Sequence, residues 1–293
     1  MVTARPSLDL RFPPEGGDWP DGADSQPYSF LLFGRFQARR TRGDWPQLDG
    51  RKLQEILAYL LLFRHRPHQR EVLAGTLWAS SSRPRSRKNL RQGLWQLQGG
   101  RQEAASRSPG TPLLLVGKDW VQVNQSGIWL DVGELETAYE AVRSTPGEKL
   151  SAGEAEAVSR AVDLYRGELL EDWREEWCIF ERERLRAINL VMLEKLLGYC
   201  EAAGRFEEGL GYGERILRHD RAHERAHWRM MRLSYLAGDR TGALRQFEKC
   251  RTALAEELGV APGRLTRTLY EQICADSREG LVSTGPASRA STS

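Results

Sequence analysis

Residues 81–100, SSRPRSRKNLRQGLWQLQGG, are the stretch of this 293-residue chain that most constrains its fold. Leu90, Leu94 and Leu97 recur at the spacing of one helix face, so we expect that face to be buried. The opposite face carries Arg, Lys, Asn and Gln, which can bind phosphates, guanine and adenine. The stretch therefore predicts a helix that reads the major groove of DNA. A solvated basic face is the plainer alternative, and the surrounding segments decide between the two.

The segments on either side of this helix predict a winged helix. Apolar residues from Leu53 to Leu61 recur at a helical period, and Pro67 stops that helix. Two short apolar segments flank Gly117-Lys118-Asp119, which indicates a hairpin. In chain order we expect an antiparallel sheet within 28–42, a helix from 51, a helix at 69–78, the basic helix, and a hairpin of 113–116 and 120–123, with 127–130 as a further strand. In a winged helix this order places the third helix in the major groove.

The second half of the chain is predicted to be helical and repetitive. The segment at residues 203–210, AGRFEEGL, is matched by AGDRTGAL at residues 237–244, an offset of 34. That is the period of the tetratricopeptide repeat, in which two antiparallel helices pack together and stack on the next pair. Gly204 and Gly238 are expected at the turns between paired helices.

The charge balance divides the chain in two. Residues 28–131 carry 17 Lys and Arg against 7 Asp and Glu, whereas residues 132–275 carry 22 against 26. A basic part joined to a mildly acidic part indicates a polyanionic partner for the first part only. The predicted fold is mainly α, with four segments: a disordered arm at 1–27, an α+β winged helix-turn-helix at 28–131, an all-α tetratricopeptide-like domain at 132–275 and a disordered tail at 276–293.

Several classes of function lack support in the sequence. The chain contains no GxxxxGK[ST] segment, no GxGxxG after a predicted strand and no GxSxG segment. His219, His223 and His227 lie four residues apart, but helix packing explains them better than a metal site does. The longest apolar run, 56–63, is too short to span a bilayer, and the N-terminus has no hydrophobic signal region. We expect a cytoplasmic protein that is not an enzyme and uses no metal or cofactor.

The two predicted parts together resemble the Streptomyces antibiotic regulatory protein (SARP) type of bacterial activator. The resemblance spans residues 28–274 and rests first on RKLQEILAYLLL from Arg51 and SRKNLRQGLWQL from Ser86. In the second half it rests on YRGELLEDW from Tyr165, ERERLR from Glu181, HERAH from His223 and GDRTGALRQFEKCRTALAEELGVAP from Gly238. Proteins of this type join an OmpR-like winged helix to a bacterial transcriptional activator domain.

The resemblance implies partners and contact residues. It implies binding to direct repeats in promoter DNA as head-to-tail protomers and recruitment of RNA polymerase. The loop between the second and third helices would contact the polymerase, here through Ser80, Ser81, Ser82 and Arg83. The implied DNA contacts are Arg85, Arg87, Lys88, Asn89, Arg91 and Gln92 in the basic helix, with Arg51, Lys52 and Lys118 on phosphates. The helical half would mediate a homodimer on DNA or bind a regulatory protein.

We predict a sequence-specific DNA-binding transcriptional regulator that activates promoters. The alternative is a scaffold whose helical repeats bind a protein partner, with the basic part only a non-specific tether to DNA. A repressor is a variant of the same prediction, because DNA recognition and the sign of regulation are separate properties. Trp95 lies off the apolar line of the basic helix, so it either packs against the wing or another protomer or lies near DNA. Lys118 is either a phosphate contact or an ordinary turn residue.

Overall fold

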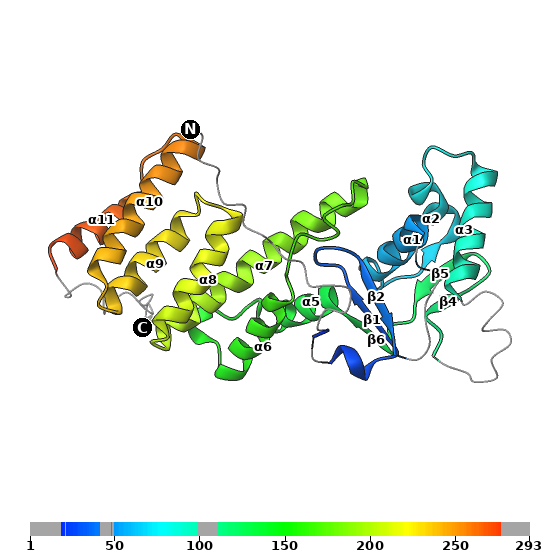
Figure 1. Cartoon of the computed structure of the whole chain (residues 1–293), viewed down its shortest axis with the longest axis horizontal. Helices are drawn as coiled ribbons and strands as arrows, with labels where there is room; N and C mark the ends of the chain where they lie inside the picture. Colours follow the sequence, from blue (N-terminus) through cyan, green and yellow to red (C-terminus); the bar gives the residue numbers. More distant parts are fainter. Residues whose placement is uncertain (1–18, 21, 42–47, 49, 99–110, 277–293) are drawn as a thin grey trace, which may run out of the picture. The chain divides into compact units, whose positions relative to one another are not determined.

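The computed structural model describes residues 19–20, 22–41, 48, 50–98 and 111–276, which form two compact units (Figure 1). The first unit comprises residues 1–32 and Phe36–Leu130. The second comprises Phe33–Arg35 and all residues from Asp131 onward. The tail expected at 276–293 lies outside the described residues except for Asp276, as does most of the arm expected at 1–27.

The first unit opens with a three-stranded sheet in the order β2–β1–β6. The strands are β1 (Tyr28–Leu31), β2 (Gln37–Arg40) and β6 (Ile128–Leu130). The first two are antiparallel, as the sequence predicts, but β6 pairs with β1 in parallel, with Phe30 opposite Leu130. The antiparallel pair expected within 28–42 is therefore confirmed, and the further strand expected at 127–130 joins it in the parallel direction, which the sequence did not predict. A parallel neighbour requires a long crossover, and here the whole helical part of the unit forms that crossover.

Residues next to β1 are ordered where the sequence predicts a disordered arm. Ala23–Ser25 form a short 3-10 helix, and the Ala23 side chain is fully buried. Ser29 Oγ donates a hydrogen bond to the Ala23 carbonyl at 2.6 Å, and Arg39 of β2 pairs with Asp24. A small buried side chain and two polar contacts thus hold this turn against the sheet.

Three helices follow the first two strands, and their apolar faces meet in one core. They are α1 (Arg51–Leu62), α2 (Arg70–Leu77) and α3 (Arg83–Leu97). The leucine face expected on the basic helix is confirmed, since Leu90, Leu94 and Leu97 are all buried. Gly93 permits the close approach of α3 to α1, because a Cβ atom there would lie 2.4 Å from Cδ1 of Ile56.

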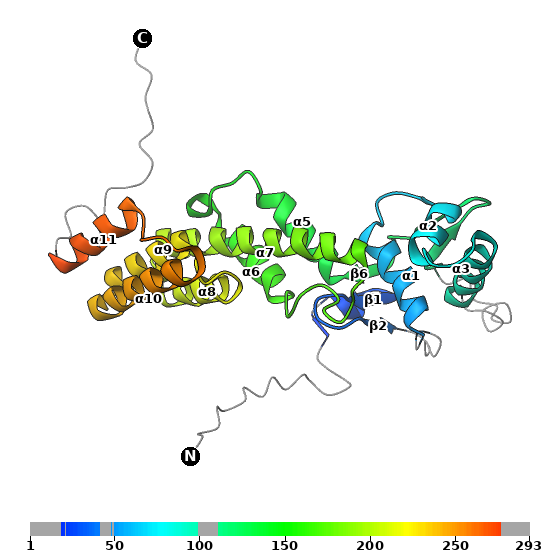
Figure 2. The same ribbon diagram turned by 90° about the horizontal axis from the view of Figure 1, so that it is seen from above.

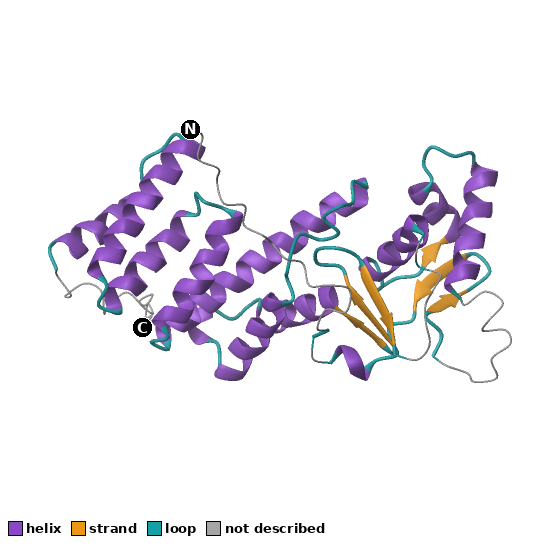
Figure 3. Ribbon diagram, in the orientation of Figure 1, coloured by secondary structure: helices purple, strands orange, loops and turns teal. Residues whose placement is uncertain are grey.

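A second small sheet carries the hairpin expected after α3. Its strands are β3 (His68–Gln69), β5 (Trp120–Val123) and β4 (Leu114–Val116), in the order β3–β5–β4 (Figure 3). The turn between β4 and β5 is closed by a hydrogen bond of 2.9 Å from the Gly117 amide to the Trp120 carbonyl. Sheet, three helices and hairpin complete the winged-helix order that the sequence predicts.

The described part of the second unit is helical. Its helices are α5 (Asp131–Val142), a 3-10 turn at Gly147–Lys149, α6 (Ala152–Asp163), α7 (Glu176–Ala202), α8 (Phe206–His219), α9 (Glu224–Leu236), α10 (Arg240–Leu258) and α11 (Arg264–Cys274). Figure 2 shows α8, α9 and α10 as neighbouring rods. The last residues of α7 and α9 are 34 apart, and so are the first residues of α8 and α10. The predicted repeat is therefore present.

Glycines make the two repeat turns and one helix contact possible. Gly204 and Gly238 have φ angles of +70° and +89°, a conformation that favours glycine over other residues. Gly209 lets α8 pack closely, since a Cβ atom there would lie 2.8 Å from Cδ1 of Leu233 in α9 and 3.1 Å from Cβ of Cys200 in α7. Small residues thus set the spacing of the repeat helices.

Arg182 organises the irregular segment between α6 and α7. Its guanidinium donates to the carbonyl oxygens of Leu169, Leu170 and Trp173 at 2.8–3.1 Å. Leu170 is buried and has a positive φ of 46°. These bonds connect two of the motifs on which the family resemblance rests, YRGELLEDW and ERERLR, so both motifs serve one local structure.

Candidate nucleic-acid interface

Helix α3 separates a buried face from a polar one. Its N-cap is Ser82, and Pro84 lies in the first turn, where a missing amide hydrogen costs nothing. Ser86 is buried and donates a hydrogen bond to the Ser82 carbonyl at 3.1 Å. The buried residues of α3 are Ser86, Leu90, Gly93, Leu94 and Leu97. At 100° per residue they form one stripe, so the outward direction of the helix is well defined.

The predicted base-reading residues occupy different parts of the outward face. Arg85, Lys88, Arg91 and Gln92 are exposed, whereas Asn89 is half-buried at the edge of the apolar stripe. Trp95 lies among the exposed residues, one turn beyond Arg91, and half of its surface is open to solvent. The structure thus brings four candidate side chains together on one surface, with an aromatic ring beside them.

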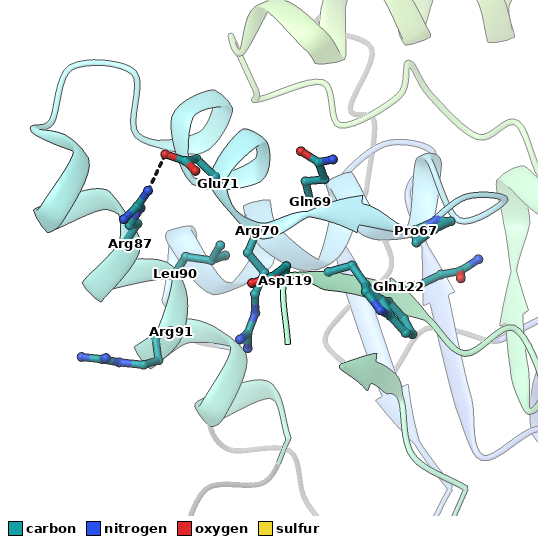
Figure 4. Close-up of a pocket in the computed structure, with 10 residues that line it drawn as sticks. Pro67, Gln69, Arg70, Glu71, Arg87, Leu90, Arg91, Asp119 and Gln122 are labelled. Carbon is teal, nitrogen blue, oxygen red and sulfur yellow. Dashed lines mark hydrogen bonds and ion pairs between the residues drawn. The ribbon is translucent and has the colours of Figure 1, made fainter. Parts of the chain in front are cut away.

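Arg87 differs from the other basic residues of α3 because it has an acidic partner, which lies on α2. Its Nη2 lies 2.5 Å from Oε1 of Glu71, in the first turn of α2 (Figure 4). Both side chains are largely exposed, at 61% and 58%. An exposed pair of this kind contributes only about 0–1 kcal/mol, so Arg87 can exchange Glu71 for a phosphate at little cost.

An open groove of about 1060 Å³ runs between α3 and the hairpin. Figure 4 shows Arg87, Leu90 and Arg91 of α3 on one side of it, with Gln122 of β5 on the other. Arg91 points away from the pair made by Arg87 and Glu71. The full lining is Pro67, Gln69, Arg70, Glu71, Arg87, Leu90, Arg91, Asp119, Trp120 and Gln122. Three arginines face two acidic residues, so the groove carries a small positive excess.

The tip of the wing is connected to the start of α2. Lys118 is exposed, and its carbonyl accepts a hydrogen bond of 3.2 Å from Nη1 of Arg70. The Arg70 amide donates to the Asp119 carbonyl at 2.9 Å. Gly117 makes room for the indole of Trp120, because a Cβ atom at Gly117 would overlap that ring. The wing therefore presents the Lys118 side chain from a turn that is held on two sides.

Arg51 and Lys52 have structural partners at the start of α1. Both pair with Glu55, a carboxylate whose side chain is only 4% exposed, at 3.4 Å and 2.5 Å respectively. Lys52 Nζ also donates to the Leu77 carbonyl at 3.1 Å and lies 5.8 Å from the Trp78 ring centroid. A buried carboxylate without cations would be costly, so these two residues stabilise the fold whatever else they contact.

The loop predicted to contact RNA polymerase is shorter than expected. Ser80, Ser81 and Ser82 lie between α2 and α3, but Arg83 is the first residue of α3. Placing Arg83 in the loop was therefore wrong. Pro84 has a fixed φ near −65° and no amide hydrogen, which suits the first turn of a helix and shifts the start of α3 forward.

Sequence reasoning did not identify Gln69, Arg70, Glu71, Trp120 or Gln122 as residues that line a site. Trp120 and Gln122 alternate with the buried Val121, so strand periodicity assigns them to one face of the hairpin. Which face looks toward α3 depends on the packing of the hairpin and is not visible in the sequence.

The three spaced histidines make separate contacts in the second unit. His219 Nδ1 lies 3.9 Å from Glu168, His223 Nε2 lies 2.9 Å from Glu194, and His227 Nε2 lies 2.9 Å from the Arg221 carbonyl. Across the described ranges, no three His, Cys, Asp or Glu side chains come together as a metal site would require. Within the same ranges, none of the helices has the length and apolar character needed to cross a membrane.

Comparison with known proteins gives a family match over most of the second unit. Residues 130–274 match the family model described as the bacterial transcriptional activator domain. The chain is 24% identical over 243 residues to the transcriptional regulatory protein MoaR1 of Mycobacterium bovis (strain BCG / Pasteur 1173P2), covering 79% of this chain and 75% of MoaR1. The MoaR1 of Mycobacterium tuberculosis (strain ATCC 25618 / H37Rv) is likewise 24% identical, over 244 residues. These relatives are named as regulators and not as enzymes.

A solved structure shows the same fold. Mycobacterium tuberculosis EmbR, determined in complex with a low affinity phosphopeptide, superposes with a TM-score of 0.62 at 20% sequence identity. The match covers 86% of this chain but 66% of the EmbR chain, so this chain spans slightly less than two thirds of that structure. The predicted fold class, a winged helix followed by a helical repeat domain, is therefore confirmed.

Proposed function

We propose, on the premise that residues 130–274 place this chain among the transcriptional regulators that carry a bacterial transcriptional activator domain, that it binds duplex DNA sequence-specifically. The observation that carries this proposal is the exposed basic and amide face of α3, which lies opposite its buried leucine stripe. Basic and amide side chains on a helix that protrudes beside a wing are suited to major-groove reading.

The exposed residues of α3 take distinct roles in this proposal. Arg91, Lys88 and Gln92 contact base edges, and Arg85 contacts the same groove nearer the start of the helix. Arg87 and Asn89 lie at the edges of the face, so we assign them to phosphates or sugars. Lys118 contacts the backbone from the wing tip. Arg51 and Lys52 support the fold through Glu55, and any phosphate contact by them is secondary.

The regulatory role proposed here is activation of transcription. The chain would bind direct repeats in promoter DNA as head-to-tail protomers, with Ser80–Ser82 and Arg83 turned toward RNA polymerase. The family resemblance supports this arrangement, and the exposed position of Ser80, Ser82 and Arg83 is consistent with it.

Selection of bound duplexes from a random DNA pool, followed by footprinting, tests the proposal. The wild-type protein should enrich a pair of direct repeats spaced by roughly one helical turn, about 10–10.5 base pairs. Duplexes selected by the Arg91→Ala protein should show a relaxed preference at one base position of each repeat. Enrichment of no sequence by the wild-type protein would contradict specific binding and leave α3 as an electrostatic surface.

A further inference from the structure

A second groove, in the helical unit, has no part in the proposed DNA contacts. It lies along α9 and is bounded by α7, the start of α11 and the 3-10 turn at Gly147–Lys149. Its volume is about 900 Å³, within the usual range of about 300–1000 Å³ for sites that hold small molecules. We call it the α9 groove, and its lining includes Glu148, Glu201, Glu224, Arg225, Trp228, Arg229, Arg232, Leu236, Arg264 and Leu265.

The floor of the α9 groove is apolar. Trp228 packs with one side against the core formed by α9, α10 and α11, and it lines the groove with other atoms. Leu236 lies two turns further along α9, and Leu265 at the start of α11 is 76% exposed. Together with Trp228 and Leu236, Leu265 gives the groove an apolar part of its lining on which an apolar body can lie.

The walls of the α9 groove carry an excess of positive charge. Arg229 and Arg232 both pair with Glu201, at 3.1 Å and 2.7 Å, and all three side chains are only 12–16% exposed. Arg232 also lies over the Trp228 ring, with its Cζ atom 5.7 Å from the ring centroid. Four arginines line the groove against three glutamates. Two partly desolvated guanidinium groups thus converge on one carboxylate.

Glu224, a second acidic residue of the groove, is engaged in capping α11. Its Oε1 accepts hydrogen bonds from the Gly263 amide at 2.7 Å and from Thr266 Oγ1 at 2.5 Å. The positive end of the α11 dipole and the exposed Arg264 lie at this point. Because Glu224 is occupied, it does not compete for the Arg264 guanidinium beside it. Arg225, the other arginine at this end of the groove, pairs with Glu194 at 3.4 Å, but its side chain is 66% exposed and can exchange that partner for an external anion.

We propose that the α9 groove binds a small organic acid with an aromatic or branched aliphatic body. Its carboxylate would pair with the guanidinium groups of the groove wall, where bidentate geometry and partial desolvation strengthen such bonds. Its apolar body would lie on Trp228, Leu236 and Leu265. None of the residues of this site belongs to α3 or the wing, so the proposal does not depend on DNA binding by the first unit.

Ligand-observed NMR tests the α9 groove with four acids and their primary amides as probes: phenylacetate, 4-phenylbutyrate, 4-methylvalerate and indole-3-acetate. We expect the full chain to bind the acids at millimolar concentration or below, and each amide at least about fivefold more weakly, because charge-assisted hydrogen bonds are roughly twice as strong as neutral ones. Arg229→Gln should remove the preference for acids. Glu201 keeps Arg232 as a partner in that variant, so the fold is retained.

Two further variants separate the groove from general effects. Leu265→Ser alters an exposed side chain and should weaken both acids and amides without loss of folding. Arg251→Gln removes one charge outside the groove and should leave both unchanged. The proposal is overturned if no acid binds, if acids and amides bind alike, or if Arg251→Gln acts as Arg229→Gln does. Binding of the blocked acidic hexapeptide EELEEL in the groove without binding of any acid would also overturn it.

Discussion

Replacing Glu71 with Gln should tighten DNA binding, although Glu71 itself is predicted to touch no base. The carboxylate holds Arg87 at 2.5 Å and adds a negative charge to the groove between α3 and the wing. Glu71→Gln removes that charge and frees the guanidinium. Both effects favour the approach of a polyanion, so the sign of the change is fixed by the geometry.

The size of the effect follows from two small contributions. When the wild-type protein binds DNA, the exposed ion pair between Arg87 and Glu71 must break, at a cost of about 0–1 kcal/mol. The Glu71→Gln variant has no such pair to break. A carboxylate about 8 Å from a phosphate is repelled by roughly 0.5 kcal/mol in water before salt screening. Together they give about 0.5–1.5 kcal/mol, a roughly twofold to tenfold lower Kd. Because Arg87 is assigned to the DNA backbone in both proteins, the log–log salt slope should change by much less than the value of about 0.9 expected for one added phosphate contact.

Fluorescence anisotropy with a selected duplex, at about 50–200 mM salt, measures both quantities. Glu140→Gln is the matched control, because Glu140 is an exposed acid of α5, in the other unit, and pairs with Arg143 just beyond the end of that helix. Unchanged or weaker binding by a correctly folded Glu71→Gln protein would refute the placement of DNA in this groove. A slightly lower melting temperature is expected, since Glu71 also lies at the favourable end of the α2 dipole.

Four further outcomes are expected. Arg91→Ala should cost about 1–3 kcal/mol in binding to the selected duplex and relax preference at one base position, as measured by competition with single-base variants. Lys118→Ala should weaken all duplexes alike and lower the salt slope by about one; a sequence-dependent loss would contradict a phosphate contact. Lys52→Ala should lower the free energy of unfolding in urea by about 1–3 kcal/mol, because the Leu77 carbonyl and the buried Glu55 lose a donor, and a large loss of DNA affinity with unchanged stability would oppose this role. His223→Asn keeps a capping oxygen for the Ala226 amide but removes the imidazole that pairs with Glu194. In the wild-type protein the hydrogen bond to Glu194 raises the pKa of His223, and the same bond lowers the pKa of Glu194. The raised pKa of His223 contributes stability below its ordinary value of 6.5, and the lowered pKa of Glu194 contributes stability above its ordinary value of 4.5. The stability difference between wild type and variant should therefore be greatest between about pH 4.5 and 6.5 and shrink at higher pH. A difference that stays constant from about pH 5 to 9 would contradict this prediction.

Local sequence signals were sufficient for much of this fold. The leucine spacing of α3 identified its buried face, the Gly117-Lys118-Asp119 turn identified the hairpin, and the offset of 34 residues identified the repeat. Each of these patterns acts within one element or between adjacent elements. Their outcome is therefore decided by residues that are close in the chain.

Contacts between residues far apart in the chain could not be predicted from the sequence. The parallel pairing of β6 with β1 joins strands separated by the whole winged helix. The pair between Arg87 and Glu71 spans two helices, and Glu55 gave no signal that it would be buried beneath Arg51 and Lys52. Charge counts assign all of these arginines and lysines to one basic part of the chain, whereas packing pairs some of them with acidic partners.

The measurement that bears most directly on the central proposal is the ratio of two dissociation constants at about 150 mM salt. One is for the duplex recovered by selection, and the other is for the same duplex with its bases scrambled. Specific DNA-binding proteins discriminate by about 10³-fold or more, and this chain should reach that range through the exposed residues of α3. Equal constants that weaken together as salt rises would show that α3 is only a charged surface and would contradict sequence-specific regulation.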